Sequence, residues 1–124
     1  TLLREDIRGG RLFVCTQYDK VHGVFALIPG NDPTYECIEG AWKNGLPYGT
    51  IHRIASDGTH KGIFKCCFDF CRRKTDNIRI DTHHDNLTMQ RVVEKNGFER
   101  CGVIYVEGGS PRIAYQYTAA EHAD

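Results

Sequence analysis

A polar, glycine-containing loop separates a β-branched segment from a helical pattern within residues 51–64 of this chain. Tyr48 to Ser56 is rich in strand-forming residues, and from Lys61 or Gly62 to about Lys74 the apolar residues recur at helical spacing. Such a connection aims backbone N–H groups and a helix N-terminus at one point, which favours an anion such as phosphate. Lys61 adds positive charge, and Gly62 lets a ligand approach the backbone. The pattern predicts a phosphate-binding loop, although an ordinary strand-to-helix connection would look the same.

The rest of the chain alternates between strand and helix patterns. Strands are expected at Arg11 to Tyr18, Val21 to Ile28, Tyr48 to Ser56, Asn77 to His83, Phe98 to Val106 and Arg112 to Tyr117, with Thr34 to Glu39 as a further strand segment. Helices are expected at Leu2 to Arg8, closed by Gly9-Gly10, then at Lys61 or Gly62 to Lys74, and from an N-cap at Asp85 or Asn86 to Asn96-Gly97. Breaks are expected at Asp19-Lys20, Pro29 to Pro33, Ala41 to Pro47 and Glu107 to Pro111, and a frayed tail at Thr118 to Asp124.

This order predicts a single α/β (α+β) domain over residues 1–124. The strand–helix–strand crossover from Tyr48 to His83 requires a parallel pair of strands, joined by a right-handed connection. The flanking hairpins are antiparallel. The central sheet is therefore expected to be mixed and mostly antiparallel.

The charge balance argues against a nucleic-acid partner. Sixteen basic residues offset sixteen acidic ones, and no basic stripe stands out. No apolar run approaches the roughly 20 residues of a membrane span, and the N-terminus has no signal-peptide pattern. A cytoplasmic protein is expected, with neither nucleic acid nor membrane among its partners.

The six cysteines form no CxxC pair, and three of them gather in one predicted helix. Disulfide frameworks and zinc sites use regular spacings, so buried free thiols in a reducing compartment are expected. The pair His83-His84 has no partner four residues away, so no metal is expected. The cysteines are Cys15, Cys37, Cys66, Cys67, Cys71 and Cys101.

A second motif runs from Asp85 to Phe98, and alone it is a capped amphipathic helix that leads into a strand. Together the two motifs resemble those of the GCN5-related N-acetyltransferase (GNAT) superfamily. In that family a strand precedes Arg/Gln-x-x-Gly-x-Gly/Ala, and a later strand precedes Asn-x-x-Ala/Ser-x-x-x-Tyr-x-Lys-x-Gly-Phe. Gly62 fits the first motif, and Asn86, Lys95, Gly97 and Phe98 fit the second.

The resemblance covers nearly the whole chain and extends to a bacterial subgroup. Its members share a Tyr-x-x-Ile-His-Arg-Ile-Ala strand and an Arg-Ile-Asp-Thr-His strand, which are found here at residues 48–55 and 79–83. Sequences of the family normally carry a first strand and one or two helices ahead of the strand at Arg11. Those elements are expected to be missing, through truncation or in a minimal relative. Without them the Arg11 to Tyr18 strand would have an open edge, which suggests a homodimer paired through that edge.

The resemblance implies a V-shaped splay between the strands that end at Ser56 and His83, with acetyl-CoA as co-substrate in the cleft. It places the pantetheine arm on the backbone of Ile54, Ala55 and Ser56, with Asn86 as a further hydrogen-bonding group. It places the pyrophosphate on the N–H groups of His60, Lys61, Gly62, Ile63 and Phe64. An amine, from a small molecule or a peptide N-terminus, then attacks the thioester directly in a ternary complex.

The chain departs from the family at three motif positions. Thr59 replaces the Arg/Gln of the phosphate loop, and Phe64, which is expected to crowd that loop, replaces a small residue. Val93 replaces the tyrosine that acts as general acid in the family.

Other side chains are therefore needed for proton transfer. His52 and His83 are candidate bases, because an imidazole has an ordinary pKa of about 6.5. Tyr105 and Tyr115 are candidate acids. A purely structural role is the alternative for all four. Cys101 is not expected to act as a nucleophile, since the sequence offers it no base.

The acceptor pocket is expected to include Tyr35, Glu39 and Trp42, where an aromatic wall and a carboxylate would suit an amine. Three functions remain open at this point: an acetyl-CoA-dependent N-acetyltransferase, a non-catalytic acyl-CoA-binding or regulatory module, and an assembly domain that uses a sheet edge and binds no ligand.

Overall fold

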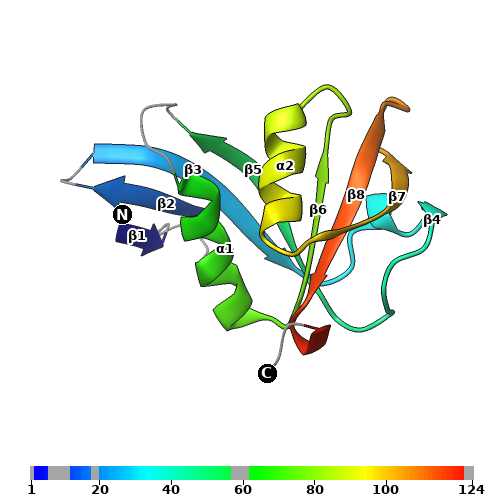
Figure 1. The fold of residues 1–124 in the computed structure, drawn as a ribbon, viewed down its shortest axis with the longest axis horizontal. Helices are drawn as coiled ribbons and strands as arrows, with labels where there is room; N and C mark the ends of the chain where they lie inside the picture. The colour runs from blue at the N-terminus through cyan, green and yellow to red at the C-terminus, as the bar shows by residue number, and fades with distance from the viewer. Residues whose placement is uncertain (1, 6–11, 18–19, 57–61, 122–124) are drawn as a thin grey trace.

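The computed structural model describes residues 2–5, 12–17, 20–56 and 62–121. Within these ranges eight strands form one sheet in the order β1-β2-β3-β5-β6-β8-β7-β4 (Figure 1). The strands are β1 (Leu2–Glu5), β2 (Leu12–Gln17), β3 (Lys20–Pro29), β4 (Glu39–Gly40), β5 (Gly49–Ser56), β6 (Asn77–Thr82), β7 (Glu99–Tyr105) and β8 (Pro111–Thr118). The helices are α1 (Ile63–Lys74) and α2 (Leu87–Lys95), with 3-10 turns η1 (Pro33–Tyr35) and η2 (Ala119–Glu121).

Every strand pair except β5 and β6 is antiparallel, which confirms the predicted mixed sheet. The parallel pair contains only two matched positions, Gly49 with Ile78 and Thr50 with Arg79. Beyond them the strands diverge, and Figure 1 shows their tips well apart. The predicted V-shaped splay is therefore confirmed. From Ile51 onward, no described strand pairs with the edge of β5 that faces β6.

The predicted helix at Leu2 to Arg8 is wrong over Leu2–Glu5, and its remainder, with the Gly9-Gly10 stop, lies outside the described residues. Leu2–Glu5 forms β1, which pairs antiparallel with β2 from Leu2–Thr16 to Glu5–Phe13. A short leucine-containing segment satisfies either pattern, and here the neighbouring strand decides the outcome. The open edge expected on the Arg11 to Tyr18 strand is wrong as well, because β1 and β3 cover both edges of β2.

Three smaller predictions also differ from the structure. Thr34 to Glu39 is not one strand, because Asp32 accepts the Thr34 N–H at 2.9 Å and caps η1, and the short β4 follows. Lys20 opens β3 and is not part of a turn. The expected tail is partly ordered, since Thr118 closes β8 and Ala119 donates its N–H to the Asp76 carbonyl at 2.8 Å.

The two faces of the sheet carry different layers. Both helices lie on the face turned toward the viewer in Figure 1, and Phe64, Phe68 and Val93 bury their side chains there. Because successive side chains alternate between faces, Ile78 and Ile80 join that core while Arg79 and Asp81 point to the other face. A second cluster, Tyr35, Tyr48, Ile104 and Ala114, covers the latter face. None of the described helices has the length and apolar character needed to cross a membrane.

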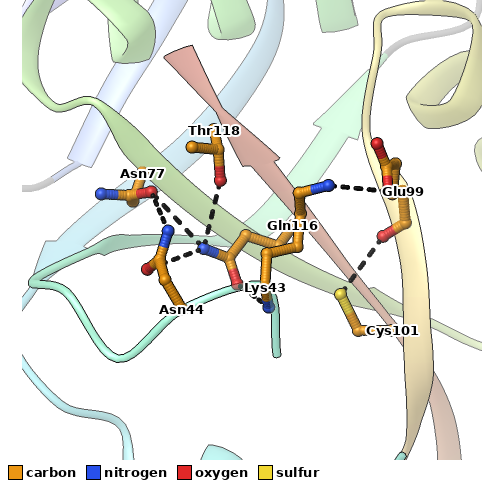
Figure 2. Close-up of polar contacts among 7 residues, drawn as sticks. All are labelled: Lys43, Asn44, Asn77, Glu99, Cys101, Gln116 and Thr118. Carbon is orange, nitrogen blue, oxygen red and sulfur yellow. Dashed lines mark hydrogen bonds and ion pairs between the residues drawn. The ribbon is translucent and has the colours of Figure 1, made fainter. Parts of the chain in front are cut away.

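A buried polar network fixes the loop of residues 41–47 on this second face (Figure 2). Gln116 is fully buried, and its side-chain carbonyl accepts the Lys43 N–H at 3.2 Å. Its amide donates to Asn44 Oδ1 at 3.4 Å, and Asn44 donates to Asn77 Oδ1 at 3.1 Å. Hydrogen bonds of this kind offset the desolvation of a buried amide. The loop that carries Trp42 is therefore held at a defined position.

The cysteines are unpaired, as predicted. Burial raises the pKa of the Cys15 thiol to about 12, and burial also raises the pKa of Cys67. The prediction of buried thiols is wrong for Cys37, which is exposed. Cys101 is half-buried, and burial raises its pKa, so it is poorly suited to act as a nucleophile.

Candidate active site

A cavity of about 400 Å³ lies where β5 and β6 splay apart. It receives side chains from β5, β6, β8, η1 and the N-terminus of α2. Five residues predicted from the sequence line it, namely Tyr35, His52, Ile54, His83 and Asn86. It also contains three charged residues that sequence reasoning missed: Asp32, Asp81 and Arg112.

His52 and Asp32 form a directly bonded pair in this cavity. Nε2 of His52 lies 2.9 Å from Oδ2 of Asp32. A carboxylate only accepts hydrogen bonds, so Nε2 carries the proton and Nδ1 of the neutral ring is left to accept another. Asp32 is itself positioned, because its N–H donates to the Tyr48 hydroxyl at 2.8 Å and its Oδ1 accepts from Thr34. This arrangement can orient an imidazole as a general base.

A backbone hydrogen bond fixes the orientation of the His83 ring. The Asp85 N–H donates to Nδ1 of His83 at 3.1 Å, so the neutral ring carries its proton on Nε2. The His83 ring stacks on His84 at 4.4 Å between centroids, and Nε2 of His84 lies 3.1 Å from Asp85 Oδ1. One ligand atom from each of these three residues lies within 4.8 Å of the others, close enough to share a metal ion. The expectation that no metal is bound stays a prediction.

Asn86, one of the two predicted N-caps, does cap α2. Its Oδ1 accepts the Met89 N–H at 3.1 Å. The acceptor atom is thereby engaged, while the side-chain NH₂ remains available to a molecule in the cavity. Asn86 and Met89 both line the cavity, so the start of α2 forms part of its wall.

Tyr35 joins the aromatic cluster to the cavity. Its hydroxyl donates to Asp81 Oδ2 at 2.7 Å, and burial together with that carboxylate holds the pKa of Tyr35 well above its ordinary value. Trp42 stands behind it, with ring centroids 5.1 Å apart and its Nε1 donating to the Tyr35 carbonyl at 2.9 Å. The Arg79 guanidinium lies 4.1 Å from the Trp42 ring centre and 3.8 Å from that of Tyr48. Trp42 therefore supports the wall and does not line the cavity.

The structure does not bring the candidate acids or Glu39 to the cavity lining. Tyr105 is 46% exposed and donates its hydroxyl to Glu39 Oε1 at 2.9 Å, a bond that raises the pKa of Tyr105. Tyr115 is buried in the helix-side core, and its hydroxyl donates to Glu94 at 3.4 Å. Burial and the Glu94 carboxylate raise its pKa. Both tyrosines are engaged elsewhere.

The cofactor-loop residues are only partly described. His60 and Lys61 lie outside the described residues, as do the side chains of Ala55 and Ser56. Gly62 caps α1 with φ of +89°, a conformation that glycine adopts without strain. Ile63 and Phe64 are both buried.

The expectation that Phe64 crowds the phosphate loop is wrong. Its ring packs into the core, 6.2 Å from the Phe68 centroid and 5.9 Å from that of Phe98. Val93, on α2, is also fully buried in this core. Two of the three departures from the family motifs are therefore core positions.

No protein-family model matches the chain, and no curated protein matches its sequence. Its structure, however, is similar to that of a GNAT-family acetyltransferase from Streptococcus agalactiae 2603. The two share 30% sequence identity with a TM-score of 0.80, over 90% of this chain and 67% of the other. The chain belongs to the GNAT family of acetyltransferases. The N-acetyltransferase class expected from the two motifs is thereby confirmed.

Two further structures share the GNAT fold at lower identity. A GNAT-family acetyltransferase from Bacillus cereus ATCC 10987 has a TM-score of 0.65 and 20% identity, covering 90% of this chain and 72% of its own. RimJ from Mycobacterium smegmatis, solved in complex with CoA-disulfide, has a TM-score of 0.63 and 18% identity, covering 94% and 57%. At these identities the likeness concerns the GNAT fold alone, and it supports acetyl-CoA binding by that fold.

Proposed function

We propose that this GNAT-family chain transfers an acetyl group from acetyl-CoA directly to an amine in a ternary complex. The observation that carries the proposal is the cavity at the splay, where the His52–Asp32 pair and Asn86 line one space. A base, a thioester site and room for an amine are the requirements of this reaction.

The free edge of β5 supports the placement of the cofactor. Ala55 and Ser56 pair with β3 through one edge, and Ile54 lies at an irregularity of that pairing. No described strand covers the other edge of Ile54 to Ser56, which offers backbone groups to a pantetheine amide, as in β-strand addition. The Asn86 NH₂ can donate to the same arm. The pyrophosphate is assigned to the backbone of residues 60–64, at the N-terminus of the 12-residue helix α1.

The proton balance follows from the His52–Asp32 pair. The neutral amine attacks the thioester carbon, forming a C–N bond, and its proton passes to Nδ1 of His52. Asp32 then stabilises the imidazolium, in the way a carboxylate orients a catalytic histidine. A backbone N–H near Ile54 stabilises the oxyanion. The C–S bond breaks, and the leaving thiolate takes up this same proton from the His52 imidazolium, which restores the neutral ring.

A non-catalytic acyl-CoA-binding module is the second candidate, favoured by Thr59 and Val93. A thermal-shift assay with acetyl-CoA, with phosphate as the control ligand, tests for binding. Release of free CoA thiol during an amine screen then separates the two candidates. A shift without thiol release from any amine would sink the transferase proposal, and the absence of an acetyl-CoA-specific shift would sink both.

Replacing Asn86 with serine is expected to weaken acetyl-CoA binding roughly 3- to 10-fold, because one neutral hydrogen bond is lost. Serine keeps an oxygen that accepts the Met89 N–H, so α2 should retain its cap. Calorimetric titration measures the affinity. Asn86→Ala, which also loses the cap, should in addition lower stability by about 1 kcal/mol. Unchanged affinity in both variants would contradict the placement of the cofactor.

A further inference from the structure

Arg112 is a cavity residue that has no partner among the described residues. It lies on β8 and is half-buried, and its Nε is buried with no hydrogen-bond acceptor. No ion pair joins its guanidinium to any described carboxylate. A buried donor without a partner destabilises the protein, and a charged one does so more strongly. No described residue supplies an acceptor to this guanidinium, so its terminal nitrogens can serve a molecule in the cavity that Arg112 lines.

Arg79 shows what a structural arginine looks like in the same sheet. Its guanidinium stacks between Trp42 and Tyr48, and its Nη2 donates to the Asn44 carbonyl at 3.0 Å. The Nε of Arg79 is also buried without an acceptor, but the rest of its guanidinium has protein partners, so Arg79 holds the wall together. Arg112 has neither the aromatic stack nor the carbonyl, and it faces the cavity instead.

The sheet places Arg112 beside the acidic part of the cavity. Asp81 pairs with Ala114, and Arg112 is two residues along the same strand, so both side chains point to the same face. His52, Asp81 and Arg112 belong to β5, β6 and β8, three successive strands. With strands about 4.8 Å apart, the backbones of His52 and Arg112 are separated by roughly 10 Å or more. The charge in the cavity is therefore divided across the strands, with Asp32 bonded to His52 on one side, Asp81 on the middle strand and Arg112 on β8.

The divided charge matches a molecule that carries both an amine and a carboxylate. Asp81 uses Oδ2 to accept the Tyr35 hydroxyl, and its other oxygen can attract an ammonium group. A guanidinium fork binds a carboxylate through two parallel hydrogen bonds. We infer that the acceptor is a small amine bearing a carboxylate, of amino-acid size, and that Arg112 binds this carboxylate. This inference rests on the proposed transfer function and favours a small molecule over a peptide N-terminus.

The test uses amino acids paired with their carboxamides as acceptors. The wild type is expected to prefer the acid about 10- to 100-fold in kcat/KM, the effect of one charged hydrogen-bonded pair. Arg112→Gln should remove most of this preference, lower the rate with the acid, and leave the KM for acetyl-CoA unchanged. Arg112→Lys should retain part of the preference. Arg73→Gln, an exposed position in the last turn of α1, is the matched control and should leave the ratio unchanged.

Three results would overturn the assignment. The first is a wild type that uses carboxamides as well as acids. The second is an equal drop in kcat/KM for acids and carboxamides in Arg112→Gln, which would indicate a structural role. A raised KM for acetyl-CoA in Arg112→Gln would give the anion to the cofactor instead. Binding separates this inference from the proposed function. A thermal shift of CoA-loaded protein that depends on Arg112 and occurs with the acid but not the amide would support the carboxylate subsite even without turnover. An equal shift with the acid and the amide would contradict the subsite.

Discussion

Replacing His52 with alanine is expected to lower kcat/KM for acetyl transfer about 100- to 10,000-fold, the usual contribution of a positioned general base. The imidazole lines the cavity, and its bond to Asp32 directs the free Nδ1 to accept a proton. Acetyl-CoA affinity should remain near that of the wild type, because the ring is assigned to the amine and not to the cofactor. Steady-state kinetics and calorimetric titration of acetyl-CoA measure the two quantities.

His84→Ala is the matched control for that variant. His84 is an exposed histidine beside the cavity, stacked on His83 but absent from the cavity lining. Its removal should change the rate little. The kcat/KM of Asp32→Asn should lie between those of His52→Ala and His84→Ala, because the amide no longer stabilises the imidazolium. If His52→Ala keeps full activity, the base is another group, and His83→Ala then tests the other candidate histidine.

Replacing Phe68 with alanine is expected to lower the free energy of unfolding by about 3–5 kcal/mol, as for other buried aromatic truncations. The ring is 3% exposed, and it packs with centroids 5.3 Å from Phe98 and 4.8 Å from Tyr117. Urea denaturation followed by circular dichroism measures the change. Phe68→Leu, which fills most of the space, should be affected much less. A loss below about 1 kcal/mol in the alanine variant would show that this core tolerates a cavity.

The long elements could be predicted because their hydrophobic patterns are decided locally. Helices α1 and α2, the hairpin of β2 and β3, and the parallel crossover from β5 to β6 all occur close to their predicted bounds. The segment Leu2–Glu5 could not be predicted in this way, since four residues satisfy either period and pairing with the following strand β2 fixes the outcome. The role of Asp32 in the cavity could not be predicted from its local sequence either. Between two prolines of a turn cluster it has the sequence appearance of a capping residue, which it also is.

Strand parity explains which site residues were identified and which were missed. Tyr115 pairs with Ile80 and so points into the helix-side core, whereas Arg112 takes the parity of Asp81 and reaches the cavity. Choosing between them requires the pairing register, and the register depends on contacts between distant segments. His52, His83 and Asn86 were found because two sequence motifs already mark the ends of the splayed strands. Asp81 lies inside one of these strands, where the alternation of Arg79 and Asp81 with Ile78 and Ile80 was the available signal.

The two-position contact between β5 and β6 divides the sheet into two plates, β1-β2-β3-β5 and β6-β8-β7-β4. Few hydrogen bonds cross this seam, so opening it requires less free energy than unfolding either plate. A molecule lodged between the plates bonds to both, and it raises the free energy of opening by an amount that grows with its concentration and affinity. Binding in the cavity is thereby linked to the rigidity of the sheet. We therefore expect a bound substrate to make the two plates more rigid relative to each other.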